Sequence, residues 1–268
     1  MNEPVVLRAE QRDLPMLFRL WEDVFGDPPE LIEAFFRYFT PEKTGWVVKR
    51  GDRLCSAAYL ITGNELLRAN ESLPAGYVYA VATAPEERGK GCAGMLMRHL
   101  EQYARKAGIL LYTRPASDRL FAWYSEKMGA KRVSRMSETE ILPESASSVI
   151  PVRRIDPAEY GEIRERYLQG KSHMVLSDPF LLFQENCSDG YFAAGDGAAC
   201  CMRQGNTLVI PELLCASEQR PQIVQSLIRS FQAERAVLRS QFPDGESPLV
   251  AFSGDDLLAE TDWGLLLE

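Results

Sequence analysis

The sequence contains few histidines, no surplus of positive charge and no long apolar segment. Only His99 and His173 occur among its 268 residues, so a histidine-rich metal site is not expected. The formal net charge of -8 provides no basic footprint for nucleic acid or an anionic membrane, although a local site for a small anion stays open. No apolar stretch is long enough to cross a bilayer, and residues 1–15 lack the apolar core of a secretion signal. These absences favour a cytoplasmic protein without a nucleic-acid or membrane partner.

The cysteines form no CxxC pair, and most of them lie in apolar surroundings typical of strands or helices. This pattern favours buried, reduced thiols over disulfides or a metal site, so we expect no metal. The hydrophobic fraction of 46% is sufficient for a sizeable core, and the length fits one large domain or two small ones. The six cysteines are Cys55, Cys92, Cys187, Cys200, Cys201 and Cys215.

The first half alternates strand-like and helical patterns in the order β-α-α-β-β-β-α-β-α-β. The helices show apolar residues at helical spacing, and Ser117 is a typical N-cap residue. The order predicts an α/β domain of the layered α+β kind, with a mixed central sheet. The predicted elements are strands over residues 5–10, 44–50, 53–62, 76–83, 108–113 and 131–142, and helices over 12–26, 29–39 and 117–129. A further helix follows residues 88–94 and carries Leu96, Leu100, Tyr103 and Ala107 on one face.

The second half repeats this order more faintly after a linker at residues 143–151. The repeat rests on element order rather than on sequence identity. It predicts two domains, covering residues 1–143 and 147–268, and the residues at 248–254 and 263–268 are predicted to be closing strands. A second, smaller domain therefore follows the first.

Residues 88–94, RGKGCAG, join the strand-like run YVYAVAT to an amphipathic helix and invite three interpretations. Gly89, Gly91 and Gly94 match the dinucleotide fingerprint G-x-G-x-x-G. That fingerprint requires its first glycine almost at the end of a strand within a βαβ unit, whereas residues 84–88 intervene here. A merely glycine-rich helix start is the second interpretation, but it leaves the clustering of such poor helix formers unexplained.

A cradle for a pyrophosphate group is the third interpretation. The start of a helix presents unpaired N–H groups and the positive end of the helix dipole. Glycines let the backbone approach a bulky anion, and Arg88 and Lys90 add positive charge. A phosphate group held there would receive several charge-assisted hydrogen bonds without a metal.

The segment Arg88-x-x-Gly91-x-Ala93 resembles the acyl-CoA motif R/Q-x-x-G-x-G/A of the GNAT superfamily of N-acetyltransferases. The element order of residues 1–142 is also the order of that family. The whole chain is similar to tandem GNAT proteins, in which a degenerate GNAT-like half follows the first. The stretch that corresponds to the cradle in the second half, residues 211–225, has no glycine and no such motif. We therefore expect one acetyl-CoA per chain.

The resemblance implies a place for each part of acetyl-CoA. The strand that ends at Val81, Ala82 and Thr83 would separate from the strand over residues 108–113 and pair with the pantetheine arm. A backbone N–H near Val81 and Ala82 would serve as the oxyanion donor. The residues that would hold the pyrophosphate are Arg88, Gly89, Lys90, Gly91, Cys92 and Ala93.

A tyrosine in the following helix often protonates the leaving thiolate in this family. Counting from Pro115 puts Tyr124 at that position, whereas counting back from Gly129 puts Ser125 there. We favour Tyr124, because a serine hydroxyl is a much poorer acid. No general base stands out.

The predicted function is transfer of an acetyl group from acetyl-CoA to a primary amine by direct attack. The alternative is an acyl-CoA-binding or regulatory module that has lost the chemistry. The acceptor could be a small molecule such as an aminoglycoside or polyamine, or a lysine side chain. The oligomeric state is not predicted.

Overall fold

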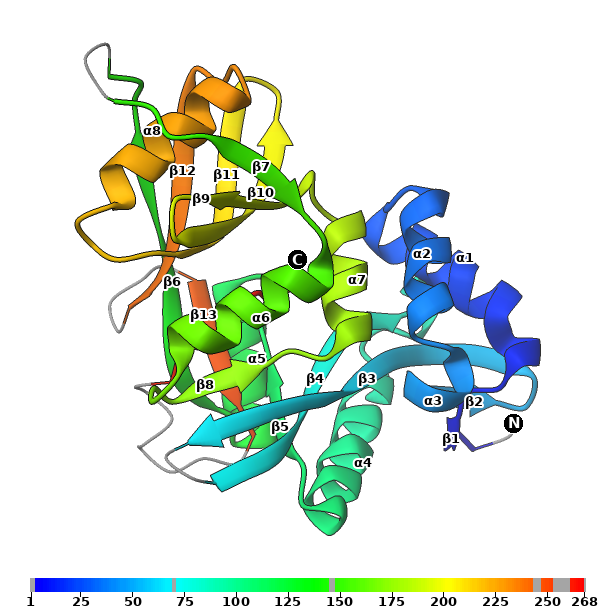
Figure 1. Cartoon of the computed structure of the whole chain (residues 1–268). Coiled ribbons are helices and arrows are strands. Elements are labelled where there is room, and N and C mark those ends of the chain that lie inside the picture. Colours follow the sequence, from blue (N-terminus) through cyan, green and yellow to red (C-terminus); the bar gives the residue numbers. More distant parts are fainter. Residues whose placement is uncertain (1–2, 69–70, 145–147, 243–246, 253–260, 268) are drawn as a thin grey trace.

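The computed structural model describes residues 3–68, 71–144, 148–242, 247–252 and 261–267. Within these residues it is a mixed α/β structure in which helices flank one large mixed sheet (Figure 1). The strands are β1 (Val5–Arg8), β2 (Gly45–Arg50), β3 (Arg53–Arg68), β4 (Glu71–Thr83), β5 (Leu110–Thr113), β6 (Lys131–Ile141), β7 (Val152–Ile155), β8 (His173–Val175), β9 (Gly190–Ala194), β10 (Gly197–Gln204), β11 (Thr207–Leu214), β12 (Arg235–Phe242) and β13 (Ser247–Ala251). The helices are α1 (Leu14–Phe25), α2 (Pro29–Tyr38), α3 (Pro41–Thr44), α4 (Cys92–Ala107), α5 (Asp118–Met128), α6 (Pro157–Leu168), α7 (Asp178–Asn186) and α8 (Arg220–Ser230).

The element order predicted for the first half is confirmed, with the four-residue helix α3 as an addition. Local sequence signals define the helix ends. Gly26 ends α1 and Gly108 ends α4, both in the left-handed conformation that glycine adopts without strain. The side chain of Ser117 accepts a hydrogen bond from the N–H of Leu120 at 3.3 Å, which confirms the predicted cap of α5.

The sheet of the first half has a buried apolar cluster on each face. Along β4, Tyr77 and Tyr79 point into a cluster that includes Trp21 of α1. Val78, which lies between them, points into the other cluster, which includes Leu96 of α4. This alternation is the two-residue period of a strand buried on both faces. The two faces of β4 therefore meet different helices, α1 and α2 on one and α4 and α5 on the other.

The last described strand, β13, completes the sheet of the first half rather than that of the second. The described strand order is β1-β2-β3-β4-β5-β13-β6-β12-β11-β10-β9-β7, with β8 paired to β3. Strand β13 is thus inserted between β5 and β6, and it is antiparallel to both. The prediction of a closing strand near residues 248–254 is confirmed for residues 248–251. The prediction of a strand at 263–268 is wrong for residues 263–267, which are irregular, and residue 268 lies outside the described residues.

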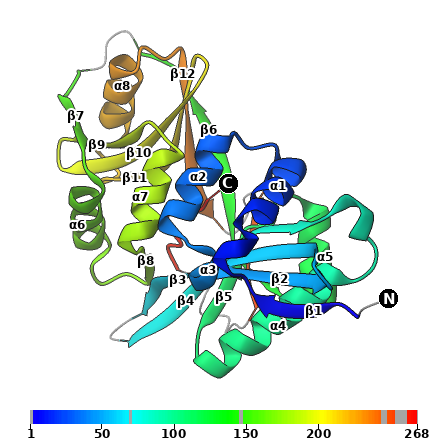
Figure 2. The ribbon, with the colours of Figure 1, turned by 90° about the vertical axis from the view of Figure 1, so that its right-hand side faces the viewer.

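The two halves interlock at further points. The hairpin of β3 and β4 extends well beyond its predicted ends, and β8 of the second half pairs with β3 at Glu65, Leu66 and Leu67. Helix α7 lies against α2, where the rings of Phe35 and Phe183 are 5.3 Å apart (Figure 2). The sequence pattern missed β8, because three residues show no periodicity. The predicted domain boundary between residues 143 and 147 stays a prediction. Strands β8 and β13 lie beyond this boundary in the chain, yet they pair with strands of the first half.

The second half follows the element order of the first only in part, because β8 stands between α6 and α7. Strand β12 was not predicted from the sequence, and helix α8 ends at Ser230, before the predicted end of this helix at residue 236. Helix α8 packs on a separate apolar cluster that includes Ile223, Leu227 and Ile210. Strands β11 and β12 are parallel, as β4 and β5 are. The GNAT-like nature of this half stays a prediction.

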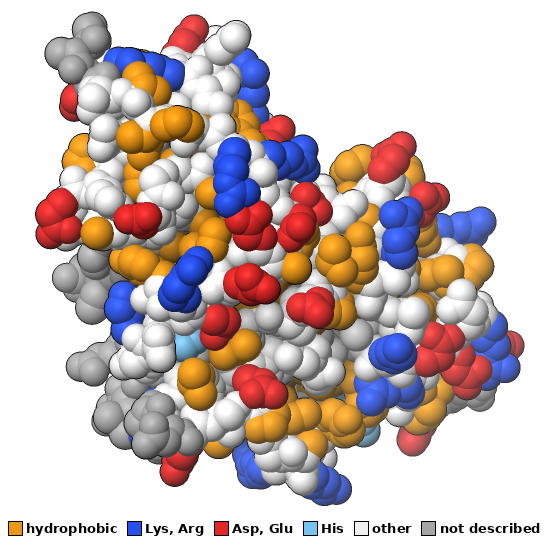
Figure 3. Space-filling model, in the orientation of Figure 1, with side chains coloured by type: hydrophobic (Ala, Val, Ile, Leu, Met, Phe, Trp, Pro, Cys, Tyr) orange, Lys and Arg blue, Asp and Glu red, His pale blue; other side chains and the backbone are white. Residues whose placement is uncertain are grey.

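No described helix is both long and apolar enough to cross a membrane. On the face of the molecule in Figure 3, acidic and basic side chains are interspersed rather than gathered by sign. Such a face has no extended field of one sign.

We expect β13 to make the stability of the first half depend on the second. Val250 is fully buried and pairs with Thr113 of β5 and Arg132 of β6. Val250→Ala should lower the free energy of unfolding by about 2 kcal/mol, through lost apolar burial and a cavity. Val5→Ala, at an exposed position of the edge strand β1, should change it by less than about 0.5 kcal/mol. Urea denaturation measures both, and equal effects would contradict the assigned role of β13.

Candidate active site: the cleft where β4 and β5 separate

Strands β4 and β5 run parallel and pair only over Ala75, Gly76 and Tyr77 of β4. Beyond that point the hydroxyl of Thr113 donates a hydrogen bond to the carbonyl of Val78 at 2.7 Å, and the strands then separate. A cleft of about 1090 Å³ lies at this separation. It is lined by β4, by the start of α4, by α5 and by the end of α1. The separation predicted from the sequence is therefore present.

A β-bulge accompanies the separation. Tyr79 pairs with Tyr59 and Ala82 pairs with Ala57, so β4 has one residue more than β3 over this stretch. Ala80 has a φ of 46°, a left-handed conformation that is strained for a residue with a side chain. Ala80 and Val81 lie outside the regular ladder and both line the cleft. The bulge thus presents backbone polar groups where a strand would otherwise use them for pairing.

The start of α4 forms the second wall of the cleft. Gly91 is the N-cap residue with a φ of 81°, and Gly89 has a φ of 77°. A Cβ atom added at either position would meet nothing within 4 Å, so both backbones face open space. Unpaired N–H groups of the first turn of a 16-residue helix therefore face the cleft with no side chain in the way. This geometry suits an anion.

Seven of the nine residues predicted to bind the cofactor line the cleft, and Ala82 and Lys90 do not. Ala82 is buried in the cluster on the α1 face. The Nζ of Lys90 lies 3.4 Å from a carboxylate oxygen of Glu87. The seven predicted cofactor-binding residues that line the cleft are Val81, Thr83, Arg88, Gly89, Gly91, Cys92 and Ala93.

Glu87 is a buried carboxylate beneath this wall. Besides Lys90, it lies 3.4 Å from Arg53 and 3.8 Å from Arg50. The thiols of Cys55 and Cys92 lie near it, with the three candidate ligand atoms within 4.8 Å of one another. A divalent cation there would have to displace three existing cations. Burial also raises the pKa of the Cys92 thiol, which disfavours the thiolate that binds metals.

The predicted acid, Tyr124, lies on α5 with its side chain buried at the cleft. Burial raises the pKa of Tyr124 well above the ordinary value, so the phenol keeps its proton. Ser125, the alternative, is exposed and is not part of the lining. Arg119 and Trp123 of the same helix also line the cleft. Because they are four residues apart, Arg119 and Trp123 share one face of the helix, and this spacing could have identified both as residues of the site.

The other end of the cleft is aromatic. Trp21 and Phe25 of α1 and the strand residues Tyr77 and Tyr79 line it, together with Asp27. The indole N–H of Trp21 donates a hydrogen bond to Asp27 Oδ2 at 2.8 Å, which fixes that carboxylate at the rim. The sequence of α1 carries no signal of a role in the site, because its apolar stripe has the pattern of an ordinary core helix.

Leu267 lines the same end, although it is 190 residues away from Tyr77 in the sequence. Its carbonyl accepts a hydrogen bond from the Tyr77 hydroxyl at 3.0 Å. No local pattern in the sequence indicates this contact.

The comparison with protein families identifies residues 6–126 as matching the model described as an acetyltransferase (GNAT) domain. No curated protein matches the chain. The matched segment contains β2 to β5, most of β1, Tyr124 and every other cleft-lining residue except Leu267.

Solved structures share the fold of nearly the whole chain. The chain is similar to a GCN5-related N-acetyltransferase from Kribbella flavida, at 17% identity and a TM-score of 0.74, over 93% of this chain and 71% of that one. A GCN5-related N-acetyltransferase from Anabaena variabilis ATCC 29413 matches at 15% identity and a TM-score of 0.75, over 93% and 72%. A tandem GNAT protein from the clavulanic acid biosynthesis pathway matches at 15% identity and a TM-score of 0.56, over 95% and 99%. The predicted fold class is confirmed.

Substitution of Gly91 should separate anion binding from folding. Gly91→Ala places a methyl group at the open mouth of the helix and forces alanine to a φ of 81°. Gly108→Ala is the matched control, because Gly108 ends the same helix with a φ of 66° and equally open surroundings. Both variants should lose about 1 kcal/mol of stability. Only Gly91→Ala should abolish the thermal stabilisation that CoA gives, and equal CoA-induced shifts in both would contradict this site.

Proposed function

We propose that the protein transfers the acetyl group of acetyl-CoA to a primary amine. The match of residues 6–126 to the acetyltransferase (GNAT) domain model supports acyl transfer in general. The observation that carries the proposal is the open, glycine-bounded start of α4 at the end of two separated strands. This combination offers a helix N-terminus to a pyrophosphate and an unpaired strand edge to an amide-containing arm.

In this proposal the pyrophosphate lies against Gly89, Gly91 and Ala93, with Arg88 as the nearby cation. The Nε of Arg88 donates to the carbonyl of Thr83 at 3.4 Å, which holds the arginine beside the cleft. Recognition rests on backbone N–H groups more than on net charge, because Lys90 is engaged by Glu87. The pantetheine arm then runs along β4 beyond Tyr77, where β5 no longer pairs with it.

One cofactor per chain is proposed, since the described start of α8, the counterpart of α4 in the second half, does not offer an equivalent site. Helix α8 starts after Gln219, which has a helical backbone, and Pro221 in its first turn has no N–H to donate. Glu218 precedes it and is exposed, so its charge would repel an anion.

Acetyl transfer requires stabilisation of the oxyanion that forms when the amine attacks. The bulge at Ala80 and Val81 supports a donor there, since the backbone groups of these residues are outside the ladder and line the cleft. A fixed N–H in a site shielded from water stabilises developing negative charge without reorganisation. The strain at Ala80 is consistent with such a preorganised position.

Tyr124 is proposed to act on the leaving thiolate. Its raised pKa keeps the hydroxyl protonated near pH 10.4, where about half of a free alkyl amine is neutral and able to attack. Because a thiol has a pKa of about 8.5, complete transfer from this phenol is uphill. The hydroxyl therefore contributes mainly by donating a hydrogen bond to the sulfur as the carbon–sulfur bond breaks.

The amine is proposed to enter from the α1 side, opposite the cofactor. Aromatic rings and the carboxylate of Asp27 suit an ammonium group attached to an apolar body. The amine must lose its proton before it attacks, since a free alkyl amine has a pKa of about 10.4. Glu30 and Glu33 of α2 are exposed and outside the cleft lining, so neither is assigned as the base.

The direct test is release of free thiol from acetyl-CoA in the presence of an amine panel. The panel should contain aminoglycosides, polyamines, aryl and alkyl monoamines and a lysine-containing peptide. Amine-dependent thiol release supports the enzyme. CoA binding without release from any amine would instead support the alternative function, a non-catalytic acyl-CoA-binding module.

Tyr124→Phe should keep CoA affinity and slow turnover by about a hundredfold. Tyr103→Phe is the matched control, because Tyr103 lies on α4 against Trp46 and does not line the cleft. The wild-type rate should not fall through loss of the Tyr124 proton near pH 10, where an unperturbed tyrosine is half ionised. Steady-state thiol release measures these effects. An unchanged rate in Tyr124→Phe, or a larger loss in Ser125→Ala, would refute the assignment.

A further inference from the structure

Residues 261–267 connect the second half to the cleft. At their start, the N–H of Asp262 donates to the carbonyl of Ser172 at 2.9 Å, and the N–H of Met174 donates to the carbonyl of Asp262 at 2.8 Å. The hydroxyls of Ser172 and Thr261 are 2.9 Å apart. This segment is therefore tied to β8 by backbone bonds, and we call residues 261–267 the tail.

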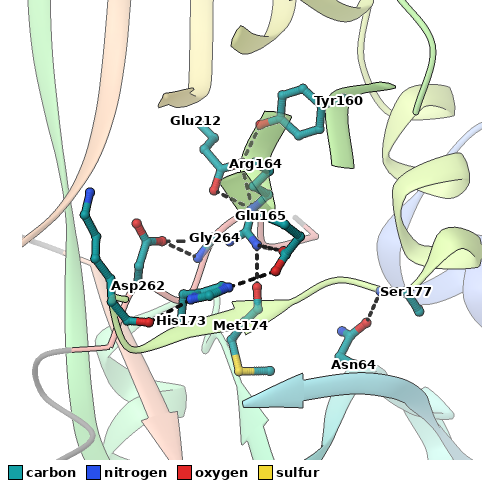
Figure 4. A network of polar contacts seen from close by, with 11 residues as sticks. Asn64, Tyr160, Arg164, Glu165, His173, Met174, Ser177, Glu212, Asp262 and Gly264 are labelled. Carbon is teal, nitrogen blue, oxygen red and sulfur yellow. Dashed lines mark hydrogen bonds and ion pairs between the residues drawn. The ribbon is translucent and has the colours of Figure 1, made fainter. Parts of the chain in front are cut away.

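Arg164 of α6 is buried at the point where the tail leaves β8 (Figure 4). Its Nε lies 3.2 Å from both carboxylate oxygens of Glu212 on β11, and its Nη1 donates to the carbonyl of Met174. Tyr160 donates to the same carboxylate, so Glu212 is itself held in place. These contacts fix the guanidinium between two elements of the second half.

The remaining nitrogen, Nη2 of Arg164, faces the tail. It lies 4.0 Å from Asp262 Oδ1, which accepts a hydrogen bond from the N–H of Gly264 at 2.9 Å. Gly264 has a φ of 64°, and a Cβ atom added there would lie 2.3 Å from Nη2. The tail therefore turns at Gly264 with its backbone directly on the guanidinium, and only glycine fits both the turn and the contact.

Beyond this turn the tail is buried against the first half. The Trp263 ring lies 5.3 Å from that of Tyr112 on β5. Leu265, Leu266 and Leu267 join the apolar cluster on the α1 face of the sheet. Leu267 ends in the cleft, with its carbonyl bound by the Tyr77 hydroxyl at 3.0 Å. The face of β4 that carries Tyr77 is the face opposite α4.

We propose that the second half determines which amine the cleft accepts, by placing the tail in its aromatic end, and that Arg164 is the positioning residue. This inference rests on the proposed function, because it concerns the amine side of that same site. A shift of about 1 Å in Leu267 would move the Tyr77 hydroxyl and the wall of the amine pocket. It would leave the start of α4, where the pyrophosphate is proposed to bind, unchanged.

Gly264→Ala tests the inference, with Gly205→Ala as the matched control. Gly205 lies in the turn between β10 and β11, has a φ of 60°, and has nothing within 4 Å of an added Cβ atom. Both substitutions impose the same backbone strain, but only the first pushes the tail away from Arg164. The probe amine is the panel member that the wild-type protein acetylates fastest.

Gly264→Ala should raise the KM for this amine about tenfold, since small misplacements in a site are costly, while the Kd for CoA changes by less than about twofold. Gly205→Ala should change neither. Equal amine KM values in the two variants, or a matching loss of CoA affinity in Gly264→Ala, would overturn the inference.

Asp262→Asn is the milder variant should Gly264→Ala not fold. It removes the charge opposite Arg164 and keeps an oxygen for the Gly264 N–H. It should raise the amine KM about threefold at unchanged CoA affinity, and an unchanged KM would also overturn the inference. If the proposed function is wrong, the wild-type protein releases no thiol with any amine. If only the inference about the tail is wrong, the wild-type protein is active and the variants keep its amine KM, so the two failures are distinguishable.

Discussion

The separation of β5 from β4 beyond Tyr77 is the constraint on which the site depends. It leaves the edge of β4 unpaired next to the bulge at Ala80, and it opens the space into which the start of α4 points. Strand β13 pairs with the opposite edge of β5 at Tyr112 and Thr113. Strand β5 therefore keeps one neighbouring strand where it separates from β4.

The electrostatics of the cleft follow from the burial of Glu87. Its carboxylate lies near three cations, Arg50, Arg53 and Lys90, so much of their charge is compensated locally. A buried carboxylate without such partners would be costly. Anion binding at the start of α4 then depends on N–H groups and the helix dipole, which explains how a chain of net charge -8 can offer a site to a pyrophosphate.

The two halves share more than a linker. Strand β8 extends the β3 edge, α7 packs on α2, and the tail reaches the cleft from the network around Arg164. Each contact buries apolar side chains or satisfies backbone groups that would otherwise face water. Through Leu267 the second half also lines the cleft, and it thereby contributes to the shape of the site.

The sequence by itself determined the parts that depend on neighbours in the chain. The alternation of apolar residues specified the strands of the first half, and glycine spacing specified the conformations at Gly89 and Gly91. The spacing from Pro115 indicated Tyr124 and the spacing from Gly129 indicated Ser125. The greater acidity of a phenol favoured Tyr124, and Tyr124 is the one at the cleft. Tertiary structure decided the rest. It brought Arg53 to the buried Glu87, made Trp21 part of the cleft and brought Leu267 to Tyr77. Such contacts between distant residues are set by packing of the whole chain, and they leave no periodic signal in the sequence.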